Sequence, residues 1–120
     1  QSVGDAISVE DESLTDAVTA LSGGGPAYVF LLIECLTEAG VQSGLPRELA
    51  AKLSLVTVAG SGQLALSSDE PPSTLRENVT SPGGTTLEAL NVLRADDGLQ
   101  PLLTRAIAAA TARSKELAAG

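Results

Sequence analysis

The residues best suited to chemistry form one short stretch, Thr80-Ser81-Pro82-Gly83-Gly84-Thr85-Thr86-Leu87-Glu88. Hydroxyl side chains, two glycines and a proline stand here directly before an apolar helical pattern. The start of a helix presents free backbone N–H groups at the positive end of the helix dipole, and glycines let another molecule approach that backbone closely. The stretch is therefore suited to holding a small anion such as a carboxylate. The same residues could also serve only to begin a helix.

The helix that follows begins somewhere between Ser81 and Thr85. Ser81 is a favourable N-cap with Pro82 as the first helical residue, because proline lacks only an N–H that would be unpaired there. Thr85 with Glu88 three residues later fits a capping box instead. Either start leaves backbone N–H groups pointing out of the chain.

The composition restricts both the fold and the chemistry. A chain of 120 residues with 43% apolar residues can build one domain with a packed core. Only 2% of the residues are aromatic, so this core must consist of aliphatic side chains and alanines, which pack closely along helices. The net charge of −8 and the lack of stacking aromatics argue against nucleic-acid binding. The sequence has no histidine, which excludes His-dependent catalysis, and we expect no metal site.

The single cysteine, the apolar runs and the first residue of the sequence indicate where the protein is located and how it is processed. The single cysteine, Cys35, lies in an apolar run, and we expect it to be buried. We find no signal-peptide pattern, and the apolar run 27–33 is too short to span a bilayer, so we expect a cytoplasmic protein without membrane contact. The sequence does not begin with methionine, and we expect it to be processed or cut from a longer chain.

The hydrophobic pattern predicts an all-α fold of about six helices and no sheet. The strand-like piece Ala6-Ile7-Ser8-Val9 has no partner strand, so we interpret residues 1–10 as the tail of the last strand of a preceding domain. Residues 11–120 then form one helical domain. Its predicted helices cover residues 11–21, 27–41, 46–66, 73–79, a segment from between 81 and 85 to about 93, and 101–118.

Three glycine-containing segments add detail. Residues 22–26 predict a flexible joint rather than a phosphate loop, since no G-K-[ST] follows; a joint close to a bound cofactor is the alternative. Gly44 and Pro46 predict the end of one helix and the start of the next. Gly60 and Gly62 each cost about 1 kcal/mol inside a helix, which indicates a tight helix crossing within one chain or between two.

The helix predicted over residues 27–41 is apolar almost all round, with only Glu34, Thr37 and Glu38 in a polar stripe. Such a helix is buried on more than one side. A chain of this length can hardly surround it alone, so we expect a second copy of the chain to cover it.

Three motifs resemble the C-terminal domain of pyrroline-5-carboxylate reductase. They are D-A-V-T-A-L-S-G-G-G-P-A-Y at residues 16–28, A-G-V at 39–41 with G-L-P-R at 44–47, and R-E-N-V-T-S-P-G-G-T-T at 76–86. Their order and spacing agree with the family over residues 9–117. Gly24 departs from the pattern, because the family usually has serine there.

The resemblance implies a domain that interlocks with a second copy as a homodimer, and a larger ring of such dimers is an open possibility. It implies a preceding Rossmann domain that binds NAD(P)H, which this sequence lacks, and reduction of 1-pyrroline-5-carboxylate to L-proline. Thr86 is then the catalytic residue, which contacts the ring nitrogen of the substrate and relays a proton. The substrate-binding residues are Ser81, Gly83, Gly84, Thr85 and Thr86. Asn78 and Thr80 are candidates for cofactor contacts near the nicotinamide or for stabilising the turn.

On this interpretation, residues 11–120 are a dimerisation and substrate-binding domain. We expect the domain alone to be inactive and to bind no cofactor. Two alternatives remain open. One is a structural helical dimerisation module without a ligand, and the other is the C-terminal domain of a related imine or hydroxyacid reductase.

Overall fold

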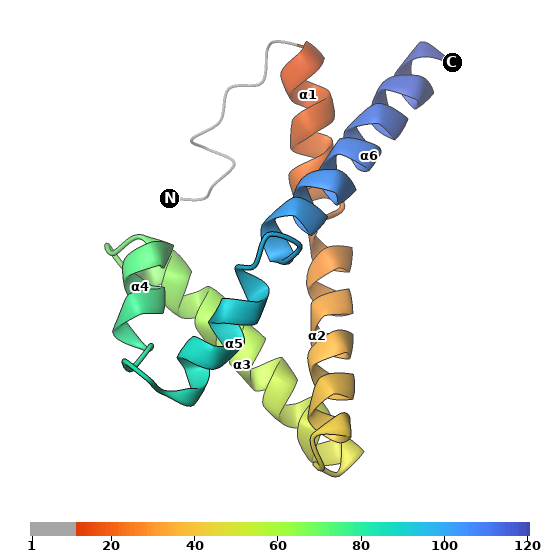
Figure 1. Cartoon of the computed structure of the whole chain (residues 1–120). Helices are drawn as coiled ribbons and strands as arrows, with labels where there is room; N and C mark the ends of the chain where they lie inside the picture. The colour runs from red at the N-terminus through yellow and green to blue at the C-terminus, as the bar shows by residue number, and fades with distance from the viewer. Residues whose placement is uncertain (1–11) are drawn as a thin grey trace. The chain divides into compact units, whose positions relative to one another are not determined.

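The computed structural model describes residues 12–120, and all regular structure in that range is helical (Figure 1). This confirms the predicted all-α fold with six α-helices, while the strand-like residues 6–9 lie outside the described range. A π-helical turn, η2 (Thr19–Gly23), joins the first two helices. The α-helices are α1 (Glu12–Val18), α2 (Gly25–Gln42), α3 (Arg47–Ser67), α4 (Pro72–Asn78), α5 (Thr85–Leu93) and α6 (Leu99–Ala119).

The chain divides into two compact units, of which one contains α1, η2 and α6. Within this unit α6 packs against both α1 and η2. Ala20 of η2 is only 3% exposed. The hydroxyl of Ser114 donates to Oδ1 of Asp16 at 2.7 Å and so joins two residues that are 98 positions apart. Apolar contact and one side-chain hydrogen bond therefore hold the two ends of the described chain together.

The glycine-rich joint differs from its prediction, because the backbone stays helical through η2 instead of breaking after the first helix. Gly24 N–H donates to the carbonyl of Thr19 at 3.2 Å, five residues back, as in a π turn. Gly24 itself has a φ of −86°, which any residue can adopt. The π turn holds one residue more than an α-helical turn, and its backbone remains hydrogen-bonded. The chain therefore continues directly into α2.

The second unit, Tyr28–Ala95, begins with a tight hairpin of α2 and α3. Gly44 has a φ of +110°, and its N–H donates to Val41 O at 3.0 Å. Leu45 N–H donates to Gly40 O, also at 3.0 Å, which completes a Schellman motif at the end of α2. The predicted stop and start at residues 44–46 is confirmed.

One ion pair spans this hairpin. Arg47 Nη2 donates to Oε1 of Glu38 at 2.9 Å, and Gln42 Nε2 donates to Oε2 at 3.2 Å. The hydrogen bond from Arg47, with a smaller contribution from Gln42, holds the pKa of Glu38 below its usual range. Both partners of the ion pair are well exposed, so it contributes little to stability.

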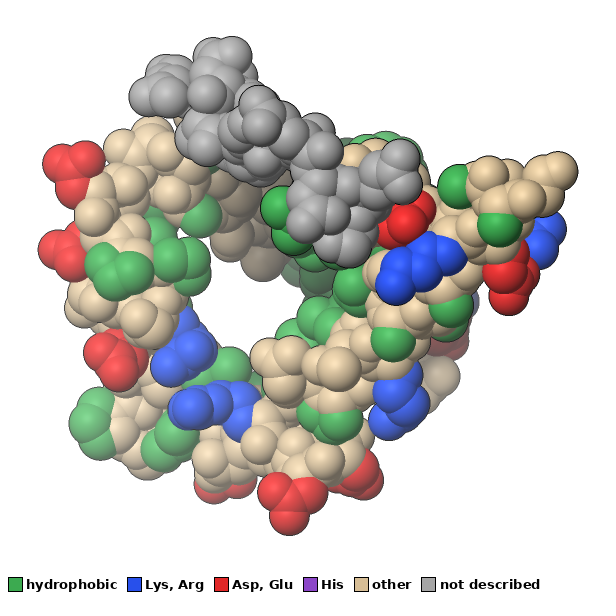
Figure 2. Space-filling view, turned by 90° about the horizontal axis from the view of Figure 1, so that it is seen from above, with side chains coloured by type: hydrophobic (Ala, Val, Ile, Leu, Met, Phe, Trp, Pro, Cys, Tyr) green, Lys and Arg blue, Asp and Glu red, His purple; other side chains and the backbone are tan. Residues whose placement is uncertain are grey.

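Most large apolar side chains of the described helices are exposed, and none of them is fully buried. Phe30 is 64% exposed and Val56 is 60% exposed. Figure 2 shows hydrophobic side chains at the surface beside the charged ones. These exposed side chains leave apolar surface on the described helices that needs a cover.

Cys35 is also exposed, so the expectation that it is buried is wrong for a single chain. By length and composition alone, two helical stretches are long and apolar enough to cross a membrane, Leu14–Gln42 and Arg47–Ser67. Of the most apolar 18-residue segment in each, 6% and 11% of the residues are buried. The helix around the apolar run 27–33 is thus longer than the run itself. Length and composition do not distinguish a membrane helix from a helix that another chain covers.

Gly44→Ala should lower the free energy of unfolding by about 1–2 kcal/mol, because a Cβ disfavours a positive φ. Chemical denaturation at fixed protein concentration measures this change. The neighbouring Ser43→Ala keeps an ordinary backbone and should change stability by less than about 0.5 kcal/mol. Equal losses in the two variants would contradict the role of Gly44.

Candidate functional site

The loop between α4 and α5 carries the residues that the sequence singled out. Gly84 N–H donates to the carbonyl of Ser81 at 3.1 Å, and Pro82 and Gly83 occupy the middle of this turn. Gly83 has a φ of +68°. Proline followed by a residue at positive φ is the arrangement of a type II turn. The positive φ of Gly83 favours glycine there, and a Cβ at Gly84 would lie 3.2 Å from the Ser81 carbonyl oxygen, a tight contact that a larger residue could keep only if the turn shifted slightly.

Helix α5 starts within the predicted range, between Ser81 and Thr85, but neither of the two caps suggested by the sequence forms. The helix begins at Thr85, and Gly84 is its N-cap without any side-chain cap hydrogen bond. Ser81 is therefore not the cap, because the Pro82–Gly83 turn stands between it and the helix. The capping box of Thr85 and Glu88 does not form either, since Thr85 is already the first helical residue.

The start of α5 offers polar groups to the outside. Its first helical hydrogen bond runs from Glu88 N–H to Gly84 O at 3.4 Å, so the amides of Thr85 and Thr86 precede it. The Gly84 amide differs, because it is used inside the turn. The side chains of Ser81, Thr85 and Thr86 are exposed, and their hydroxyls form no hydrogen bond within residues 12–120.

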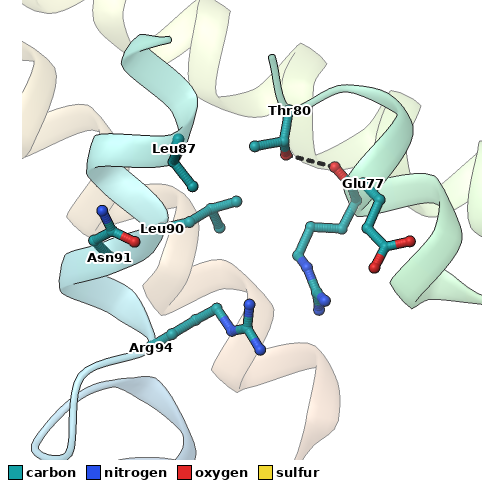
Figure 3. Close-up of a pocket in the computed structure, with 7 residues that line it drawn as sticks. Glu77, Thr80, Leu87, Leu90, Asn91 and Arg94 are labelled. Carbon is teal, nitrogen blue, oxygen red and sulfur yellow. Dashed lines mark hydrogen bonds between the residues drawn. The ribbon is translucent and has the colours of Figure 1, made fainter. Parts of the chain in front are cut away.

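Asn78 and Thr80 stand in different environments. Asn78 is the last residue of α4, is exposed, and has a side chain without a hydrogen bond in the described part of the chain. Thr80 is half-buried, and its Oγ1 donates to the Arg76 carbonyl at 2.6 Å (Figure 3). Of the two, only Asn78 has a donor available for another molecule.

A cleft of about 210 Å³ lies beside this loop, between α4 and α5, and the sequence analysis did not identify it. Figure 3 shows Leu87 and Leu90 of α5 pointing toward α4. Asn91 and Arg94 follow Leu87 and Leu90 at helical spacing, so they lie on the same face of this segment. This change from apolar to polar side chains along one face is the sequence pattern that could have indicated the cleft. The lining residues are Arg76, Glu77, Thr80, Leu87, Leu90, Asn91 and Arg94.

Comparison with known proteins decides the family. Residues 12–117 match the family described as pyrroline-5-carboxylate reductase dimerisation. The chain belongs to this family. The resemblance seen in the three motifs is confirmed, and so is the assignment as a C-terminal dimerisation domain of pyrroline-5-carboxylate reductase.

Relatives named pyrroline-5-carboxylate reductase occur in distant organisms. The chain is 50% identical over 116 residues to the reductase of Pseudomonas aeruginosa, covering 97% of this chain and 42% of that protein. It is 47% identical over 107 residues to that of Arabidopsis thaliana, covering 89% and 38% of the two chains. The chain thus spans about two fifths of the length of the curated relatives it matches.

Solved structures of this reductase family share the fold. The pyrroline-5-carboxylate reductase of Coxiella burnetii has a TM-score of 0.85 at 45% identity, with 91% of this chain and 40% of that chain covered. The Plasmodium falciparum pyrroline carboxylate reductase, solved with NADP bound, has a TM-score of 0.82 at 42% identity, with 88% and 40% covered. The exposed apolar helices are what a domain of the dimerisation family is expected to present.

Proposed function

We propose that this chain is the part of a pyrroline-5-carboxylate reductase that forms the homodimer and binds the substrate carboxylate. The whole enzyme reduces 1-pyrroline-5-carboxylate to L-proline with NAD(P)H. The observation that carries the proposal is the start of α5, where exposed hydroxyls and backbone amides stand together in a domain of this reductase family.

The carboxylate of the substrate is a small anion, and the first turn of α5 suits it. The Ser81 hydroxyl and the amides of Thr85 and Thr86 donate to the carboxylate oxygens at the positive end of the helix dipole. Hydrogen bonds to an ionised group are among the stronger ones. Gly83 and Gly84 contribute by their conformation, because the Gly84 amide is already paired with Ser81 O at 3.1 Å.

Thr86 is placed one residue into the helix, beside the same amides, and its hydroxyl is exposed. Its hydroxyl donates a hydrogen bond to the ring nitrogen of the imine and relays a proton to that atom from solvent water, from which the hydroxyl regains the proton that it gives. A protonated imine is strongly electrophilic, so no acidic side chain is needed beyond this relay. The chain then acts mainly by positioning and by fixed dipoles, in agreement with a sequence that has no histidine.

NAD(P)H, when bound, supplies the hydride. In this chain the exposed Asn78 amide fits a contact with the nicotinamide carboxamide, whereas the Thr80 hydroxyl is already donated within its own loop. The remaining cofactor contacts belong to a Rossmann half. The fragment alone is therefore expected to bind no cofactor and to be inactive.

The second copy of the chain covers the exposed helices in this proposal. On α3, one face carries Leu49, Leu53, Val56 and Leu64, which are 44–60% exposed. Gly60 lies on the same face, and nothing in the described chain stands within 4 Å of a Cβ built there. A partner helix can approach the backbone at this point. We expect a cytoplasmic enzyme in which a partner chain, not lipid, covers these helices, and in which such dimers can assemble further into a ring.

Thr86→Ala in a full-length reductase that contains this domain should lower kcat by about 10²-fold, since a positioned proton donor contributes roughly that much. Steady-state kinetics with 1-pyrroline-5-carboxylate measures the change, and light scattering should show the dimer unaltered. Thr104→Ala, the same substitution on α6, is the matched control. Unchanged turnover in Thr86→Ala would remove this residue from the mechanism.

Ser81→Ala should chiefly raise KM for the imine, by about tenfold, because one charge-assisted hydrogen bond to the carboxylate is lost. Ser73→Ala, which removes an exposed hydroxyl from α4, controls for the substitution itself. If KM for the imine stays at the wild-type value, Ser81 does not bind the carboxylate.

Gly60→Leu should shift the domain from dimer to monomer, because a leucine side chain keeps the partner helix at a distance. Sedimentation over a range of concentrations measures this shift, and circular dichroism should show the helix content retained. Gly62→Leu lies about 200° round the helix and should weaken the dimer less. Wild-type association in Gly60→Leu would exclude a close helix crossing at this residue.

A further inference from the structure

One hydroxyl in the loop before α5 has no part in the proposed chemistry, that of Thr80. Helix α4 ends at Asn78, so carbonyl groups in its last turn lack helical partners. The Arg76 carbonyl accepts Thr80 Oγ1 at 2.6 Å and Val79 N–H at 3.3 Å. Thr80 N–H also donates to Glu77 O at 3.1 Å. Thr80 is therefore attached to the end of α4 through both its backbone and its side chain.

Two other threonines make the same side-chain contact in a different setting. Thr37 Oγ1 donates to Ile33 O at 2.8 Å, and Thr111 Oγ1 donates to Ile107 O at 2.7 Å. Both lie inside long helices, where the carbonyl four residues back already accepts a backbone N–H. Thr80 lies beyond the end of its helix, and its own N–H donates to Glu77 O, so the Arg76 carbonyl receives the Thr80 hydroxyl where a helix would supply the N–H of the fourth residue on.

The position of Thr80 determines where the substrate loop begins. Ser81 follows directly, and its carbonyl accepts Gly84 N–H at 3.1 Å in the turn that leads to Thr85. Thr80 is half-buried and lines the cleft together with Leu87, which belongs to the first turns of α5 (Figure 3). The residue thus contacts the helix before the loop and faces the helix after it.

We propose that Thr80 is a positioning residue for the carboxylate site, and this inference rests on the proposed function. Its hydroxyl fixes the start of the turn against the end of α4, so that the Ser81 hydroxyl and the α5 amides converge on one anion. The role differs from the cofactor contact expected from the sequence, because the donor of Thr80 is used within the loop.

The test compares three variants in a full-length reductase that contains this domain, assayed with 1-pyrroline-5-carboxylate and NADPH. Thr80→Val keeps the shape of the side chain but removes the hydroxyl, and it should raise KM for the imine by about tenfold, the factor given by a hydrogen bond worth about 1.4 kcal/mol. KM for NADPH should stay within about twofold. Thr80→Ser restores the hydroxyl and should return KM for the imine to near the wild-type value.

Thr111→Val is the matched control, because it removes the same type of hydrogen bond from α6. It should leave both KM values unchanged. If Thr80→Val fails to assemble, Thr80→Ala compared with Thr80→Ser repeats the test with smaller side chains.

Two outcomes would overturn the positioning role alone. One is a Thr80→Val enzyme with a lower melting temperature and the wild-type KM for the imine, which would mean a purely structural role. The other is a rise in KM for NADPH without a rise for the imine, which would mean a cofactor contact. A wild-type enzyme that does not reduce 1-pyrroline-5-carboxylate would overturn the proposed function, and the positioning role with it.

Discussion

The constraint on which the rest depends is that the chain cannot cover its own apolar helices. Ala50 and Ser54 of α3 are buried, but the leucines and Val56 of the same helix are exposed. Burial of apolar surface is the main favourable term in folding, so helices of this kind are stable only when another surface covers them. Membership of a dimerisation family identifies a protein chain as the expected cover. Gly60 lies in the middle of the exposed face of α3. A glycine there is compatible with cover by a second chain, since it leaves the backbone accessible where a partner helix must come close.

The candidate site follows from a second constraint, which is the pairing of backbone groups at helix ends. At the end of α4, the Arg76 carbonyl accepts both the Thr80 hydroxyl and the Val79 N–H. At the start of α5, no side chain caps the helix, so its first amides remain available. The C-terminal carbonyl of α4 is thus paired within the protein, whereas the N-terminal amides of α5 remain available to a ligand. In the turn between them, the positive φ of Gly83 favours glycine, and Gly84 stands in close contact with Ser81.

The sequence predicted the number, type and approximate limits of the helices, because hydrophobic spacing and glycine and proline signals agree along most of the chain. It placed the start of α5 correctly between Ser81 and Thr85 but did not identify the N-cap, because Ser81 and Thr85 both match cap patterns whereas the Pro82–Gly83 turn makes Gly84 the N-cap. It also failed for Cys35, since a hydrophobic neighbourhood in sequence does not show which chain covers it. The spacing of Leu87, Leu90, Asn91 and Arg94 indicated one wall of the cleft, but the cleft itself was missed because it depends on the placement of α4 opposite that face.

The groups assigned to the substrate share a chemical property that suits the proposed reaction. Backbone amides and the hydroxyls of Ser81 and Thr86 do not ionise near neutral pH, so the positive potential they give a carboxylate is a fixed property of the fold. Such a site needs no perturbed side-chain pKa to hold its ligand, and it needs only that the donors stay aligned. Alignment in turn depends on the hydrogen bonds of the loop, above all the 2.6 Å contact of Thr80 with the end of α4. In the proposed function, a chain without histidine therefore serves an imine reduction by geometry, because the reactive group would come with the cofactor and the chain would supply orientation.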